Sequence, residues 1–81
     1  MVKAQDKTVS KDSLEHYAQL AATNLYAYNT TEAIKYSSKL ISMAEAGSYD
    51  YYQFEGYNLL GDVYTNIKDT LLARQSYEKG L

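Results

Sequence analysis

The chain has 81 residues and no cysteine, which allows one small domain without disulfides or a thiolate metal site. A single histidine leaves little for an imidazole site, so the sequence predicts no metal and no other cofactor. Between residues 13 and 66, two lysines stand against six acidic residues, and this local charge of −4 disfavours nucleic-acid binding.

Residues 1–12 mix charged and polar side chains and are expected to form an extension before the folded part. They lack the apolar stretch of a secretory signal, so the expected location is the cytoplasm. The longest uncharged stretch, residues 16–31, is too short and too polar to span a membrane.

The first predicted helix begins near Asp12, because Asp12 and Glu15 have the spacing of a capping box. Its apolar residues recur mostly at intervals of three and four, the helical period. They are Leu14, Tyr17, Ala18, Ala21, Leu25 and Tyr28.

The second predicted helix begins at Asn29, which repeats the capping spacing with Glu32. It is expected to end at Gly47, since glycine tolerates the left-handed conformation of a helix C-terminus. The residues expected along its buried face are Ala33, Ile34, Ser37, Leu40, Ile41 and Ala44.

A third helix is predicted from about Tyr49 to Ile67 with Ser48 as its cap, and a fourth from Asp69 to the end of the chain. A strand over residues 49–54 is the alternative, because aromatic residues favour pleated surfaces. The helical spacing of apolar residues continues to Ile67, beyond normal strand length, and therefore favours a helix. Short connections predict antiparallel neighbours in an all-α chain.

The sequence repeats weakly when it is shifted by 40 residues against itself. The shift pairs Tyr17 with Tyr57, Leu20 with Leu60, Ala21 with Gly61, and Ala33 with Ala73. We expect the small residues among these pairs to let helix backbones approach closely. They are Ala21, Ala33, Gly61 and Ala73. The second unit resembles the tetratricopeptide repeat, with the family's spacing of large and small residues. The residues that carry the resemblance are Tyr57, Leu60, Gly61, Tyr64, Ala73 and Tyr77.

The resemblance implies two antiparallel helix hairpins stacked as a short right-handed α-solenoid. The domain would span residues 13–81, with units 13–47 and 48–81. The first unit departs from the pattern, because Asn24 and Ser37 stand where aromatic residues are expected. The spacing of 40 residues also exceeds the family's usual period of about 34.

In arrays of this family, the first helix of each unit lines a concave groove that holds a peptide or protein segment. The resemblance therefore implies a protein–protein interaction module of a scaffold or regulatory protein, not an enzyme, and no catalytic residue is predicted. The predicted binding residues are Glu15, Ala18, Ala22, Leu25 and Tyr26 in the first helix and Glu55, Asn58, Asp62, Thr65 and Asn66 in the third.

The expected partner is a basic or neutral polar segment with one or two apolar anchors. The predicted groove contains no Lys or Arg, and Glu55 and Asp62 favour cations. A clamp for a C-terminal carboxylate is disfavoured for the same reason. The predicted binding residues of the third helix form a narrow polar stripe, and the alternative interpretation is that this stripe is merely solvated.

Self-assembly is the second class of function that the sequence allows. Two units are fewer than the roughly three that usually bury a continuous core. Residues 69–81 are expected to leave Leu71, Leu72 and Leu81 partly uncovered, which favours a homo-oligomer or a longer array.

Three other interpretations are disfavoured by the residues themselves. His16 follows Glu15 directly, and adjacent helical side chains point about 100° apart, so an acid–base pair is not expected. Glu55 and Asp62 lie two helical turns apart without a deep pocket to perturb their pKa values, so they are expected to line the groove. Several of the ten tyrosines lie at or near packing positions of the repeats, so core or interface packing is expected and not a platform for nucleic-acid bases.

Overall fold

The computed structural model describes residues 10–81, which form four α-helices and no strand. The helices are α1 (Lys11–Tyr26), α2 (Thr30–Gly47), α3 (Asp50–Asn66) and α4 (Thr70–Gly80). The all-α class is therefore confirmed, and the strand considered for residues 49–54 is wrong. Residues 1–9 of the expected extension lie outside the described part of the chain.

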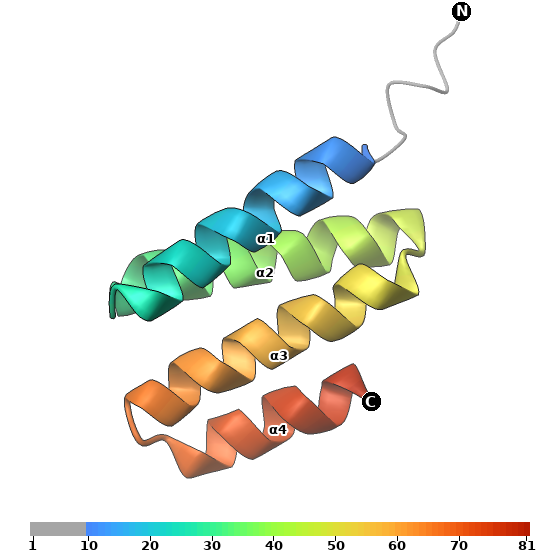
Figure 1. Ribbon diagram of the computed structural model, residues 1–81. Coiled ribbons are helices and arrows are strands. Elements are labelled where there is room, and N and C mark those ends of the chain that lie inside the picture. Colours follow the sequence, from blue (N-terminus) through green and yellow to red (C-terminus); the bar gives the residue numbers. More distant parts are fainter. Residues whose placement is uncertain (1–9) are drawn as a thin grey trace, which may run out of the picture.

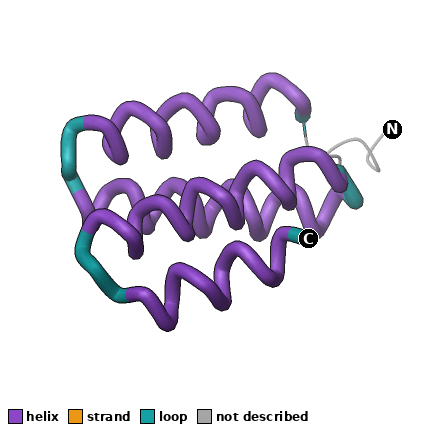
Figure 2. Tube along the Cα trace, turned by 60° about the horizontal axis from the view of Figure 1, so that its bottom comes forward, coloured by secondary structure: helices purple, strands orange, loops and turns teal. Residues whose placement is uncertain are grey.

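The helices lie side by side in chain order, and the chain turns back at each connection (Figure 1). The connections are the short teal segments of Figure 2. Helix α1 contacts both α2 and α3, whereas α4 contacts only α3 within residues 10–81. Because α3 contacts all three other helices, it occupies the centre of the arrangement.

Leucines and small residues form the buried core between the helices. The predicted buried face of α2 is confirmed, except that Ile34 is only half-buried. Tyr28 was expected on the apolar face of the first helix, but it follows the end of α1 and is 74% exposed. The buried residues of α1 are Leu14, Ala18, Ala21 and Leu25, and those of α2 are Ala33, Ser37, Leu40, Ile41 and Ala44.

Glycines allow α3 to lie close to both of its neighbours along the chain. A Cβ atom at Gly61 would overlap the ring of Tyr77 on α4. A Cβ atom at Gly56 would lie 2.6 Å from Cγ1 of Ile41 on α2. The atoms nearest to Gly61 thus belong to the Tyr77 ring, whereas a neighbouring helix backbone was expected there. Backbone atoms of Ile41 are among the nearest atoms at Gly56, whose role was missed.

The first three helices end in the same way, with a left-handed residue just beyond the helix. These residues are Tyr28, Ser48 and Lys68, with φ angles of 60°, 59° and 64°. In each case the next amide bonds back to a carbonyl in the last helical turn, as in the Schellman motif. The left-handed role predicted for Gly47 is wrong, because α2 continues through Gly47 and the reversal occurs at Ser48.

The helix N-termini differ in part from the predicted caps. Ser10 caps α1 in place of Asp12, since its Oγ accepts from the amides of Asp12 and Ser13 at 3.1 and 3.4 Å. Ser48 does not cap α3, because Tyr49 occupies the N-cap position. Asp69 caps α4 as predicted, and its Oδ1 accepts from the amide of Leu72 at 3.1 Å.

The α1–α2 and α3–α4 connections have nearly the same backbone conformation. Ala27 has a φ of −85° and a ψ of 0°, and Ile67 has a φ of −97° and a ψ of 9°. The N-cap residue Asn29 has a φ of −84° and a ψ of 79°, and the N-cap residue Asp69 has a φ of −90° and a ψ of 82°. Tyr28 and Lys68 between them are both left-handed. The 40-residue repeat of the sequence therefore reappears in the shape of these two turns.

Candidate functional site

A surface pocket lies where residues near the C-terminal ends of α1 and α3 meet. Its volume is about 240 Å³. Five of the ten predicted binding residues line it, two from α1 and three from α3. We call it the α1–α3 pocket, and its residues are Leu25, Tyr26, Tyr28, Asp62, Thr65 and Asn66.

The apolar side of this pocket comes from α1 and the residues that follow it. Leu25 is buried, with 7% of its surface exposed, and belongs to the core. Tyr26 and Tyr28 are 78% and 74% exposed. Two large aromatic groups thus stand in solvent beside a fixed aliphatic wall, where a partner's side chain can cover them.

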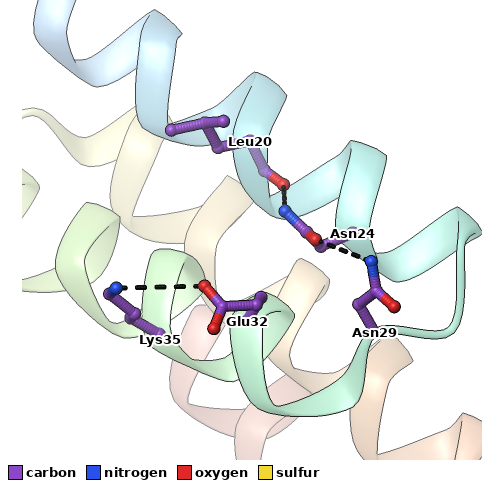
Figure 3. A network of polar contacts seen from close by, with 5 residues as sticks. All are labelled: Leu20, Asn24, Asn29, Glu32 and Lys35. Carbon is purple, nitrogen blue, oxygen red and sulfur yellow. Dashed lines mark hydrogen bonds and ion pairs between the residues drawn. The ribbon is translucent and has the colours of Figure 1, made fainter.

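Polar contacts around Asn24 hold the turn that carries Tyr28 (Figure 3). The Asn24 amide Nδ2 donates to the carbonyl of Leu20 at 2.8 Å. Asn24 Oδ1 accepts from Nδ2 of Asn29 at 3.1 Å. Figure 3 also shows Glu32 and Lys35 on α2, whose Oε1 and Nζ atoms are 3.8 Å apart. Asn24, which departs from the tetratricopeptide pattern, therefore ties the end of α1 to the start of α2.

The polar side of the pocket is anchored to α4 through Tyr77. The Tyr77 hydroxyl donates to Asp62 Oδ1 at 2.5 Å and lies 3.3 Å from Thr65 Oγ1. Thr65 Oγ1 also donates to the carbonyl of Gly61 at 2.9 Å. Burial raises the pKa of Tyr77, and the hydrogen bond to Asp62 raises it further against a lowering by Thr65. Tyr77 therefore remains a donor at neutral pH and orients the carboxylate of Asp62.

The other five predicted binding residues lie outside the pocket lining. Ala18 belongs to the buried core, and Ala22 packs against that core. Glu15 is exposed, but its Oε1 accepts a hydrogen bond from Tyr52. Glu55 and Asn58 are half-buried on α3. The structure thus gathers the C-terminal members of the predicted set and separates them from the rest.

Two other tyrosines, both on α3, also donate hydrogen bonds to carboxylates on neighbouring helices. Tyr52 donates to Glu15 on α1 at 2.9 Å, and Tyr57 donates to Glu45 on α2 at 3.0 Å. The hydrogen bond to Glu15, followed by burial, raises the pKa of Tyr52. Burial, followed by the hydrogen bond to Glu45, raises the pKa of Tyr57. These carboxylates serve the fold as acceptors.

Tyr28 is the pocket residue that the sequence interpretation missed. Its helical spacing from Leu25 placed it on the buried face of the first helix. A signal was present, because the 40-residue shift aligns Tyr28 with Lys68, just before the Asp69 cap. Residues just before a helix cap commonly lie in a turn.

Residues 10–81 contain neither a metal-binding cluster nor a membrane-spanning helix. No group of three acidic or histidine side chains in this range is placed to hold a metal ion. None of the four helices combines the length and the apolar character needed to cross a bilayer. Comparisons of the chain with protein-family models, curated proteins and solved structures find no match.

Proposed function

We propose that this chain is a protein–protein interaction module that holds a segment of a partner in the α1–α3 pocket. In this proposal, α1–α2 and α3–α4 are two antiparallel hairpins stacked as a short right-handed α-solenoid of the tetratricopeptide type. The matching turns at residues 27–29 and 67–69 support it, because repeated hairpins need repeated turns. The module acts by binding in the cytoplasm and not by catalysis.

One observation carries the proposal: the pocket joins residues of α1 and α3, helices that are not consecutive in the chain. In a stack of hairpins these are the first helices of successive units, which line the groove of such arrays. The pocket also combines exposed aromatic rings with one carboxylate and two polar side chains. Such a mixture suits a peptide better than a wholly apolar ligand.

The chemistry of the pocket favours a basic or neutral polar segment with an apolar anchor. Leu25, Tyr26 and Tyr28 offer apolar surface for the anchor. Asp62 attracts a cation, and a tyrosine face stabilises a nearby ammonium or guanidinium by cation–π attraction. The charge of −4 over residues 13–66 disfavours nucleic acid as the partner.

Selection from a random peptide library displayed on phage tests this proposal. Enriched peptides are expected to carry Lys or Arg next to an aromatic or aliphatic residue, and their synthetic forms to bind with micromolar Kd in fluorescence anisotropy. Asp62→Lys is expected to weaken this binding by roughly tenfold or more, since it replaces attraction by repulsion. Enrichment of acidic peptides, or of none, would contradict the proposal.

Three variants complete the experiment. Glu55→Lys tests whether the partner extends along α3 beyond the pocket, and is expected to weaken binding less than Asp62→Lys. Tyr77→Phe removes the hydrogen bond to Asp62 but keeps its charge, so it separates orientation from attraction. Glu78→Lys changes the net charge equally on an exposed part of α4 and is expected to leave the affinity unchanged. Equal loss in Asp62→Lys and Glu78→Lys would show that only net charge matters.

A second candidate function is self-assembly through residues 69–81, favoured by the uncovered face of α4. Leu71 is 55% exposed and Leu72 is 37% exposed, and α4 contacts only α3 in the described chain. The 40-residue shift aligns Leu81 with Ile41. The side chain of Ile41 packs against Gly56 of the next helix, whereas Leu81 is 96% exposed. A second copy of the chain is the proposed occupant of this face. Light scattering decides: a stable monomer contradicts assembly, and a dimer with a closed α1–α3 pocket contradicts peptide binding.

A further inference from the structure

A second pocket lies between α1 and α2 and shares no residue with the α1–α3 pocket. Its volume is about 550 Å³, within the range of roughly 300–1,000 Å³ of small-molecule sites. We call it the Lys–Tyr pocket, and it is lined by Tyr17 of α1 and by Lys35, Tyr36, Ser38 and Lys39 of α2.

The two aromatic rings of this pocket lie against each other, and each has an ammonium group beside it. The ring centroids of Tyr17 and Tyr36 are 6.1 Å apart, with an angle of 31° between the rings. Lys35 Nζ lies 5.3 Å from the centroid of the Tyr36 ring. Lys39 Nζ lies 6.0 Å from the centroid of the Tyr17 ring. Cation–π attraction favours this placement of both charges at the pocket.

Positive charge is concentrated here in an otherwise acidic region. Lys35 and Lys39 are the two lysines of residues 13–66, a range without arginine, and both line this pocket. Lys35 pairs with Glu32 at 3.8 Å, but both side chains are about half or more exposed, at 64% and 48%. Exposed pairs of this kind contribute little, so an incoming anion can replace Glu32. Within residues 10–81, Lys39 has no carboxylate at ion-pair distance.

These features select an anion with two charges and a flat apolar part. Two ammonium groups match a phosphate monoester, which carries about −1.5 to −2 at neutral pH, better than a single carboxylate. The hydroxyl of Ser38 supplies a further donor. The rings of Tyr17 and Tyr36 supply an aromatic wall, on which another aromatic ring packs in an offset or edge-to-face arrangement.

We propose that the Lys–Tyr pocket binds a phosphotyrosine side chain of a partner protein. Its phosphate is held by Lys35 and Lys39, and its ring packs against Tyr17 and Tyr36. This site is independent of the α1–α3 pocket, so one chain can engage two segments of a partner. Phosphorylation of the partner then controls binding at the Lys–Tyr pocket and leaves the α1–α3 pocket unaffected.

NMR-detected titration of the full chain tests this assignment with phenyl phosphate, inorganic phosphate, adenosine monophosphate and a short peptide with or without phosphate on its tyrosine. Phenyl phosphate is expected to bind at least tenfold more tightly than inorganic phosphate and to shift the ring signals of Tyr17 and Tyr36. The phosphorylated peptide is expected to bind at least tenfold more tightly than the unmodified one. Equal binding of phenyl phosphate and inorganic phosphate overturns the proposal, and so does tighter binding of the nucleotide than of the phosphopeptide.

Variants that each remove one lysine charge provide the second test. Lys35→Gln and Lys39→Gln are each expected to weaken phosphopeptide binding by about tenfold, because each removes one charge-assisted hydrogen bond. Lys79→Gln changes the net charge equally on an exposed part of α4 and is expected to have no effect. A loss in Lys79→Gln that matches the loss in Lys39→Gln means that only net charge attracts the ligand and refutes the site. All three lysines are exposed, so circular dichroism should show unchanged folding.

Discussion

The hydroxyl of Tyr52 on α3 donates a hydrogen bond of 2.9 Å to Oε1 of Glu15 on α1. Equivalent bonds of tyrosine to carboxylate join Tyr57 of α3 to α2 and Asp62 of α3 to α4. Each contact that α3 makes with another helix therefore carries one such bond. All three depend on a protonated phenol, which makes the fold sensitive to alkaline pH.

Stability is expected to fall as the pH rises above about 10. The pKa values of Tyr52, Tyr57 and Tyr77 are all raised from 10.0 in the folded chain. Because the pKa is higher in the folded chain, the unfolded chain releases these phenol protons first as the pH rises. The contribution of the three hydrogen bonds to stability is therefore complete below pH 10, and it is lost as the pH rises through each folded pKa. Urea unfolding between pH about 9 and about 12 measures this loss. Tyr52→Phe should flatten the fall, while Tyr26→Phe, at an exposed tyrosine, should leave it unchanged.

Gly61→Ala is expected to lower the free energy of unfolding by roughly 1–3 kcal/mol, because the added methyl group meets the Tyr77 ring. Gly47→Ala is the matched control. Gly47 is exposed and does not have a positive φ, so alanine should be neutral there or stabilise α2 by up to about 1 kcal/mol. Thermal unfolding of both variants provides the measurement. Equal effects in the two would rule out a steric role for Gly61.

Ser48→Gly is expected to stabilise the chain by about 1 kcal/mol, because glycine adopts the left-handed conformation at this position without steric cost. Ser42→Gly makes the same change at an exposed site inside α2, where glycine weakens the helix. The two variants should therefore shift the urea midpoint in opposite directions. A destabilising Ser48→Gly would indicate that the serine side chain makes a stabilising contact.

Ser37→Ala is expected to stabilise the fold by about 1 kcal/mol. Ser37 is fully buried, and its Oγ has no hydrogen-bond partner in the part of the chain that the structure describes. Removing the hydroxyl abolishes its desolvation cost and should raise the Tm by roughly 4–8 °C per kcal/mol. Ser38→Ala at the exposed neighbour should change the Tm little. A lower Tm for Ser37→Ala would show that the buried hydroxyl has a polar partner.

The helices and their approximate ends were predictable because the signals for them are local. Apolar periodicity and the Asp69 cap need only neighbouring residues to be interpreted. The choice between adjacent capping residues is not local in this way. Helix α2 ends at Gly47 as predicted, but the left-handed residue that reverses the chain is Ser48 and not the glycine.

The orientation of α3 was harder to predict, because three neighbours share its surface. Four of its buried residues, Tyr52, Gly56, Leu59 and Val63, follow one stripe at intervals of four, three and four. Gly61 is buried on the opposite side of the helix, against Tyr77 of α4. The sequence interpretation relied on Leu60, which is half-buried, and overlooked Leu59, which is 8% exposed. A single periodic face describes a helix with one packing partner well and a central helix poorly.

The candidate site was predictable only in part for a related reason. Asp62, Thr65 and Asn66 were visible as polar positions on one helix. Their grouping with Leu25 and Tyr26 depends on contacts between α1 and α3, which are distant in sequence. Tyr28 joined them because the chain reverses at that residue.

The contact pattern of α3 and α4 also sets the order in which the chain loses structure. Opening α4 breaks contacts with a single neighbour and leaves α1, α2 and α3 packed together. Opening α3 breaks its contacts with α1, α2 and α4 at once and leaves only α1 packed against α2, so it requires more free energy than opening α4. Amide protons of α4 should therefore exchange with solvent sooner than those of α3, and the C-terminal helix can detach transiently while the rest of the molecule stays folded.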